Sequence, residues 1–141
     1  VELAEDDYRI IKEKCDELNL DLIVTPFDLD SAEFCNELGV TAFKIGSADM
    51  INYELIEKAF SFNKPVIVST GMWTEEEIQA AITKFRTFGE NDFFMLLANS
   101  TYPTPYESIN LEFLSKLNQM HIHPYRRCNF GSKNSRKAHY F

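Results

Sequence analysis

The sequence predicts an α/β fold built around a parallel sheet. Four short apolar runs alternate with amphipathic segments at intervals of about 20–30 residues, the spacing expected of right-handed βαβ units. Three of these runs, IVTPF, VIVST and FMLLA, are apolar rather than alternating, which is typical of strands buried on both faces. We therefore expect one α/β domain over residues 1–120.

Strands and helices are expected to alternate after one initial helix. The predicted strands are residues 21–28, 41–47, 64–71 and 92–100, rich in β-branched and aromatic side chains. The predicted helices are residues 5–18, 30–38, 53–62, 75–88 and 109–120, with apolar side chains at helical spacing.

Local signals mark the ends of two predicted helices. Asp30, followed by Glu33, resembles a capping box for the second helix, which Gly39 ends. Thr74, followed by Glu77, forms the same pattern before the fourth helix. These signals predict where the chain turns between sheet and helix.

The net charge of −8 conceals a sharp division along the chain. Residues 1–120 contain all 22 acidic residues and carry a charge of −13, whereas residues 121–141 carry +5. The net negative charge of residues 1–120 argues against nucleic acid as a partner, because phosphate binding needs a basic surface. We interpret residues 121–141 as a disordered basic tail of anomalous composition, which a frame shift would explain. Its His121 and His123 are poor candidates for a metal site for that reason.

Nothing in the sequence indicates a membrane or a secreted protein. No apolar run approaches the roughly 20 residues of a membrane span, and no signal peptide is recognisable. The three cysteines are odd in number and widely separated, so they predict neither disulfides nor a metal motif. We expect a cytoplasmic protein. The chain begins with Val1, which suggests that the sequence does not start at a natural initiation codon.

Polar residues, most of them with hydroxyl groups, lie in the carboxyl-terminal half of every predicted strand. They are Thr25, Lys44, Ser47, Ser69, Thr70 and Ser100. An open doubly wound sheet and a closed βα-barrel both fit the order of the elements. Because a barrel site draws on residues from several strand ends, whereas a switch-point crevice draws on fewer, we favour a TIM-type βα-barrel.

The predicted edge where the strands end has the composition of an anion site. Lys44 supplies a fixed positive charge, and the hydroxyls of neighbouring strand ends supply neutral donors. Backbone amides after Gly46 and Gly71 would add to it. The simpler interpretations are that Lys44 extends its ammonium into solvent from a strand end and that Thr25 merely ends a strand.

Two acids and one aromatic complete the candidate site. Asp49 and Glu107 could orient a hydroxyl or move a proton, although Asp49 could equally cap a helix. Tyr102 lies in the segment TYPTPYE, where Pro103 and Pro105 stiffen the chain. A stiff aromatic beside an anion site is suited to binding a sugar.

Taken together, the motifs resemble the N-acetylneuraminate (sialic acid) synthase family, which includes pseudaminic and legionaminic acid synthases and spore-coat polysaccharide enzymes. The motifs are TPF at 25–27, KIGSAD at 44–49, NY at 52–53, KPVIVSTGM at 64–72 and YPTPYE at 102–107. The resemblance extends over nearly all of residues 1–120. It implies a partial barrel of about four βα units, the third to the sixth strands of eight.

The resemblance also implies substrates and roles. The family condenses phosphoenolpyruvate with an N-acetylated amino sugar: the enol carbon attacks the sugar aldehyde, water adds and phosphate leaves. Lys44 and Thr25 would hold the carboxylate of phosphoenolpyruvate, and Ser47 with Ser100 its phosphate. Asp49, where the family often has Glu, would engage the amino sugar together with Tyr102.

The resemblance implies a divalent metal, Mn or Mg, whose histidine ligands lie beyond the segment that ends near residue 120. Residues 119–141 match no such segment, so the metal ligands are expected to be missing from this chain. A homodimer is possible for the intact enzyme.

Two alternatives stay open. The chain could be an inactive half-barrel that at most binds phosphoenolpyruvate weakly, or a Schiff-base aldolase with Lys44 as its nucleophile.

Overall fold

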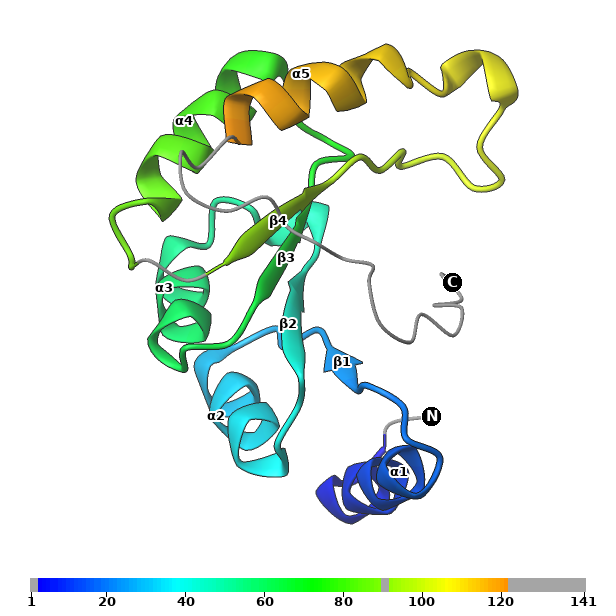
Figure 1. Cartoon of the computed structure of the whole chain (residues 1–141), viewed down its shortest axis with the longest axis vertical. Coiled ribbons are helices and arrows are strands. Elements are labelled where there is room, and N and C mark those ends of the chain that lie inside the picture. Colours follow the sequence, from blue (N-terminus) through cyan, green and yellow to red (C-terminus); the bar gives the residue numbers. More distant parts are fainter. Residues whose placement is uncertain (1–2, 90–91, 122–141) are drawn as a thin grey trace.

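The computed structural model of the chain describes residues 3–89 and 92–121. One parallel sheet contains four short strands, β1 (Ile23–Val24), β2 (Ala42–Ile45), β3 (Val66–Ser69) and β4 (Phe93–Leu96). The helices are α1 (Glu5–Glu17), α2 (Leu29–Leu38), α3 (Tyr53–Ser61), α4 (Glu75–Phe85) and α5 (Glu112–His121), as Figure 1 shows. Every predicted strand and helix is present, although the strands are shorter than predicted. The proposed tail lies, from residue 122 onward, outside the described residues.

The order of the strands separates the two candidate architectures. In a doubly wound sheet the strand order reverses at a switch point, so that helices cover both faces. Here every strand lies beside its predecessor, in the order β1-β2-β3-β4, and every pair is parallel. Right-handed crossovers without a reversal place the helices on one face, and Figure 1 shows α2, α3 and α4 on the same side of the sheet. The fold is α/β and corresponds to part of a βα-barrel.

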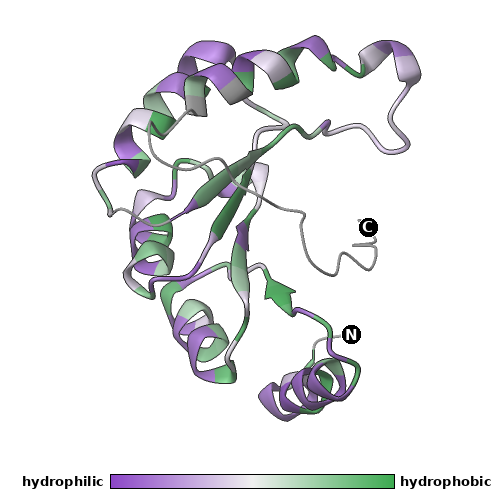
Figure 2. Cartoon of the chain, viewed as in Figure 1, coloured by the Kyte–Doolittle hydropathy of each residue, from purple (hydrophilic) through white to green (hydrophobic). Residues whose placement is uncertain are grey.

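The helix-covered face of the sheet holds the core. The register pairs Phe43 with Val66 and Val66 with Phe93, so these three side chains point to the same face. All three are buried, and the inward side chains of α2, α3 and α4 pack with them. Figure 2 shows that the strands are mostly hydrophobic, whereas the helices are hydrophilic along much of their length.

Aromatic rings fill the space between β4, α3 and α4. Phe85 lies 5.7 Å from Phe93 between ring centroids, in an edge-on arrangement, and Phe60 lies 5.8 Å from both Phe88 and Phe93. Offset and edge-on ring pairs of this kind contribute beyond the area that they bury. The cluster therefore anchors two helices to the last strand of the sheet.

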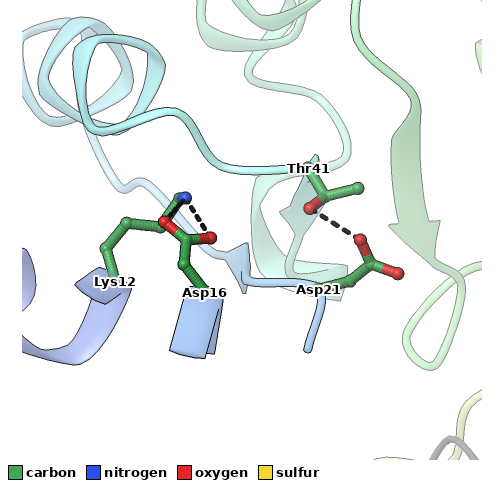
Figure 3. Close-up of polar contacts among 4 residues, drawn as sticks. All are labelled: Lys12, Asp16, Asp21 and Thr41. Carbon is green, nitrogen blue, oxygen red and sulfur yellow. Dashed lines mark hydrogen bonds and ion pairs between the residues drawn. The ribbon is translucent and has the colours of Figure 1, made fainter. Parts of the chain in front are cut away.

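The first helix is amphipathic as predicted but is only partly covered. None of its residues is buried, and its contact with α2 includes Tyr8, whose ring lies 6.1 Å from that of Phe34. Figure 3 shows two polar contacts at this end of the molecule. Lys12 pairs with Asp16 one turn along α1 at 2.6 Å, and the Thr41 hydroxyl donates to Asp21 at 3.0 Å.

One predicted helix start is wrong. The N-cap of α2 is Asp28, not Asp30, because Asp28 has extended backbone angles and its carboxylate accepts from the Ser31 amide at 2.7 Å. The Asp30–Glu33 pair already lies inside the helix. The bond from the Ser31 amide lowers the pKa of Asp28 below its ordinary value of 3.8.

Of the other predicted boundaries, two are confirmed and two are shifted by three residues. The Thr74–Glu77 capping box is present, and Gly39 ends α2 with a φ of 80° in the left-handed region. α4 ends at Phe85 rather than at residue 88. α5 begins at Glu112 rather than at residue 109, since a separate 3₁₀ turn occupies Tyr106–Ser108.

Truncation of the aromatic cluster is expected to destabilise the fold. Phe85→Ala removes a fully buried ring and leaves a cavity, so the free energy of unfolding should fall by about 3–5 kcal/mol. Urea denaturation followed by circular dichroism measures this change. Phe27→Ala is the matched control, because Phe27 is 71% exposed and its loss should change the stability little. Equal losses for the two variants would contradict the core described above.

Candidate functional site

The carboxyl ends of the four parallel strands lie at one edge of the sheet. Thr25 follows β1 directly, Lys44 is the penultimate residue of β2, and Ser69 ends β3. Ser100 lies in the segment that follows β4. The sheet therefore brings to a common edge the polar residues that the sequence places after its strands.

Lys44 lies on the sheet face opposite the helices. It pairs in register with Ile67, and Ile67 pairs with Phe94, so this row alternates with the buried row of Phe43. The lysine is half-buried. None of the ion pairs found within residues 3–89 and 92–121 involves Lys44. Its charge is therefore free, within this part of the chain, to bind an anion at the edge.

A chain of hydrogen bonds links the ends of β2, β3 and β4. The Gly71 amide donates to the Ser47 hydroxyl at 3.0 Å, and the Ser100 hydroxyl donates to the Gly71 carbonyl at 2.6 Å. Both hydroxyls thus bond to the backbone of one residue, Gly71, on its amide and on its carbonyl. The consequences for the two serines differ. Ser47 accepts, and within residues 3–89 and 92–121 its own hydrogen has no recorded acceptor, whereas Ser100 has committed its hydrogen to the protein.

Two further hydroxyls at the end of β3 are almost fully buried. The Thr70 hydroxyl donates to the Leu96 carbonyl at 3.1 Å, so this hydrogen bond links the ends of β3 and β4. Ser69 lies two residues beyond Ile67 and therefore on the same face as Lys44. Among the described residues no hydrogen bond to the Ser69 hydroxyl is found. Ser69 is accordingly a second donor that could meet a ligand beside Lys44.

Thr25 and Asp49 also lie at this edge. The β1–β2 register pairs Val24 with Phe43, so the next step along the chain sets Thr25 beside Lys44. Asp49 ends the short 3₁₀ turn Ser47–Asp49 and is half-buried. Its carboxylate lies over Gly46, where an added Cβ would be 3.6 Å from Oδ2. The structure thus brings both residues to the strand end that carries Lys44.

Tyr102 and Glu107 are placed differently. Tyr102 is 98% exposed, and Glu107 is exposed in the 3₁₀ turn Tyr106–Ser108. Asn99 secures this segment through a bond from its side-chain amide to the Ser108 carbonyl at 3.2 Å. A ring so exposed packs against none of the described edge residues, and its assignment to sugar binding stays a prediction.

The structure adds Trp73, which the sequence does not single out as a site residue. Its indole N–H donates to the Ser47 carbonyl at 2.6 Å. The available signal was chemical: a tryptophan that is partly buried needs a hydrogen-bond partner for its N–H.

Trp73 also lines a pocket of about 360 Å³ between the amino-terminal ends of α4 and α5. The other lining residues are Glu75, Asn110, Glu112, Phe113 and Lys116. Lys44, Ser47 and Ser100 do not line it, so this pocket is separate from the anion site.

The described residues offer no ready metal site and no membrane helix. No group of three or more His, Cys, Asp or Glu side chains comes together in residues 3–89 and 92–121. In the same part of the chain, no helix has both the length and the apolar character that crossing a membrane requires. Burial raises the pKa of Cys35 and lowers that of Lys64, but Lys64 precedes β3 and so lies at the other edge of the sheet.

Comparison with known proteins assigns the family. The sequence model of the NeuB family matches residues 1–125. The chain belongs to the NeuB family. Among curated NeuB-type relatives, the N-acetylneuraminate-9-phosphate synthase of Drosophila melanogaster is 34% identical over 117 residues, which cover 83% of this chain and 32% of that protein. The N,N'-diacetyllegionaminic acid synthase of Legionella pneumophila is 32% identical over 121 residues, covering 83% of this chain and 34% of that protein.

Solved structures agree with the NeuB assignment. The N-acetylneuraminic acid (sialic acid) synthetase of Leptospira borgpetersenii, solved with citrate, superposes with a TM-score of 0.78 at 30% identity. The match covers 84% of this chain and 41% of that one. The chain thus spans about a third of the length of the curated relatives. The resemblance to sialic, legionaminic and pseudaminic acid synthases is confirmed at the level of the family.

Substitution of Gly71 tests the close packing at the edge. A Cβ at Gly71 would lie 3.2 Å from the Ser47 hydroxyl and 3.3 Å from Ala98, so Gly71→Ala should lower the free energy of unfolding by about 1–3 kcal/mol. Gly46→Ala is the matched control, since its nearest contact would be an ordinary 3.6 Å and its φ of −65° suits alanine. Thermal and urea unfolding would measure both. A Gly71→Ala protein as stable as the control would show that the three strand ends are not tightly packed.

Proposed function

We propose that this chain supplies the phosphoenolpyruvate-binding part of a synthase that joins phosphoenolpyruvate to an N-acetylated amino sugar. Membership of the NeuB family supports the reaction class. The observation that carries the proposal is the placement of Lys44 at the same edge of the sheet as the hydroxyls of Ser47 and Ser69, whose hydrogens have no acceptor among the described residues. A cation with neutral donors suits a small ligand that bears a carboxylate and a phosphate.

Lys44 and Thr25 would bind the carboxylate. The two residues lie side by side at the ends of β1 and β2, and the ammonium would supply the charge while the hydroxyl supplies a directed hydrogen bond. Charge-assisted bonds are shorter and stronger than neutral ones, so Lys44 should contribute most of the affinity. Its position in a strand, rather than in a loop, fixes the direction of approach.

Ser47 would donate to the phosphate through its free hydrogen. Ser100 would join it only by releasing the Gly71 carbonyl, to which it donates at 2.6 Å. The exchange is favourable in principle, because a phosphate oxygen is a stronger acceptor than a neutral carbonyl. Ser100 would then bind the leaving phosphate more tightly as negative charge builds up on it, which is how such a donor contributes to rate.

Asp49 and Tyr102 would act on the amino sugar. Asp49 lies on the turn that follows Ser47, close enough to the edge to orient a sugar hydroxyl or to move a proton. Tyr102 is exposed and would reach the sugar by movement of the segment between β4 and α5. The aromatic ring would pack against the apolar face of the sugar.

A divalent metal is expected for this reaction, where it would polarise the sugar aldehyde. The acids described here do not fit such a site, because no three candidate ligands converge in residues 3–89 and 92–121. The roles above therefore involve only binding, orientation and proton movement by this chain's own residues. The cytoplasmic location and a homodimer of the whole protein belong to the same proposal.

Removal of the Lys44 charge should weaken binding of phosphoenolpyruvate by the 141-residue chain. Loss of a charge-assisted contact predicts a dissociation constant about 10- to 150-fold higher for Lys44→Ala. Titrations followed by NMR chemical shifts measure weak binding directly. Lys14→Ala is the matched control, because Lys14 pairs with Glu17 on α1, outside the site. If Lys44→Ala and Lys14→Ala bind phosphoenolpyruvate equally well, the assignment of Lys44 is wrong. If the wild-type chain does not bind it, the alternative of an inactive half-barrel is supported instead.

Trapping with borohydride separates the proposal from a Schiff-base aldolase. An aldolase that uses Lys44 would form an imine with pyruvate, which borohydride reduces to a stable secondary amine. We expect no added mass on Lys44 when the chain is incubated with pyruvate and borohydride and then analysed by peptide mass spectrometry. Pyruvate attached to Lys44, and absent from Lys44→Arg, would establish the aldolase instead.

A further inference from the structure

Trp73 is linked to the candidate site by a hydrogen bond from its indole nitrogen. It follows Met72 in the short connection between β3 and α4, is half-buried, and packs against the edge of the core. Its indole N–H donates to the Ser47 carbonyl at 2.6 Å, across 26 positions of sequence. A ring that only filled space at this position would not need a donor directed at the candidate site.

Ser47 is therefore held at two points by one short loop. The Gly71 amide donates to its hydroxyl at 3.0 Å, and the Trp73 indole donates to its carbonyl. A residue held by one bond can still rotate about it, whereas two bonds to separate groups fix both its backbone and its side chain. The position of the Ser47 hydroxyl oxygen, from which its hydrogen would be directed to a ligand, follows from this double attachment.

The loop that holds Ser47 is itself well defined. The Trp73 amide donates to the Thr70 carbonyl at 3.2 Å and closes a turn directly after β3. On the other side, the Ser47 carbonyl accepts a second, longer bond of 3.4 Å from the Met50 amide. Without the indole, the carbonyl would keep only this weaker partner, and the turn Ser47–Asp49 would be free to shift.

Burial of the ring does not account for Trp73 by itself. The side chain also lines the pocket between α4 and α5 together with Phe113 and Lys116, so part of it faces open space rather than the core. A phenylalanine would keep much of the packing but would lose the N–H. The indole nitrogen is thus the feature that distinguishes tryptophan at this position.

We propose that Trp73 is a positioning residue, which holds the Ser47 turn through its indole N–H and so orients the Ser47 hydroxyl toward the phosphate of phosphoenolpyruvate. The phosphate part of this inference rests on the function proposed above. The positioning part does not, since it concerns the free protein. The two parts are tested by separate measurements.

The first measurement is made without a ligand. Trp73→Phe should weaken the hold on Ser47, so that the Gly71 amide proton exchanges with solvent about 2- to 10-fold faster, the effect of losing one neutral hydrogen bond. Amides of the core strands, such as those of Ile45 and Val68, should exchange as in the wild type. Tyr8→Phe, which removes a polar atom from a half-buried ring on α1, is the matched control. Unchanged exchange at Gly71 in a folded Trp73→Phe protein would overturn the positioning role.

The second measurement is a double-mutant cycle on binding of phosphoenolpyruvate by the full chain. If Trp73 acts through Ser47, Trp73→Phe should weaken binding about 2- to 10-fold in the wild type and not at all in Ser47→Ala. Equal losses in both backgrounds would identify Trp73 as merely structural. If the wild-type chain does not bind phosphoenolpyruvate while Gly71 exchange still responds, the proposed function fails and the positioning role stands.

A third measurement decides the question if Trp73→Phe does not fold. Trp73 is the only tryptophan in the chain, so its indole N–H gives a single, assigned NMR signal in the unsubstituted protein. That proton should be protected from exchange, and phosphoenolpyruvate should shift its signal in the wild type but not in Ser47→Ala. An indole proton that exchanges as fast as a solvent-exposed one would overturn the proposal.

Discussion

The parallel register of four short strands is the constraint on which the candidate site depends. The pairs Phe43–Val66 and Val66–Phe93 set three buried side chains in one row, and the row that contains Lys44 and Ile67 must then face the other way. A slip of one residue would turn Lys44 toward the helices and expose Phe43. The hydrophobic core therefore holds the charge of Lys44 at the open face. No local interaction of the lysine is needed to place it there.

Much of this arrangement can be predicted from the sequence, because the deciding signals are local or periodic. Continuous apolar runs identify the strands, and Gly39 and Thr74 sit where backbone geometry or capping requires them. The start of α2 could not be read in the same way. Asp30 with Glu33 matches the usual capping-box sequence, whereas the structure forms the box between Asp28 and Ser31, because Asp28 is the residue that leaves helical geometry. That is set by how the chain leaves β1, which is a tertiary property.

The candidate site, too, could be predicted only in part from the sequence. The sequence names Ser47 and Ser100 as hydroxyls that follow strands, but it cannot say where their hydrogens point. Ser100 donates to the Gly71 carbonyl, and Ser47 accepts from the Gly71 amide, so residues of one type are left with opposite capacities toward an anion. Trp73 was missed for a related reason: its partner, the Ser47 carbonyl, is a backbone atom and leaves no trace in the sequence.

The strength of the Lys44 site depends on what covers the helix-free face of the sheet. At this face Ile67 is half-buried, whereas Ile23 at one edge strand and Leu96 at the other are 47% and 38% exposed. Opposite charges 4 Å apart attract with about 1 kcal/mol in water but about 4 kcal/mol at the effective dielectric of a protein surface. A barrel closed over this face would therefore strengthen the contact between Lys44 and a carboxylate without moving either group. The same residues form a weak anion site on an open sheet and a strong one inside a complete barrel.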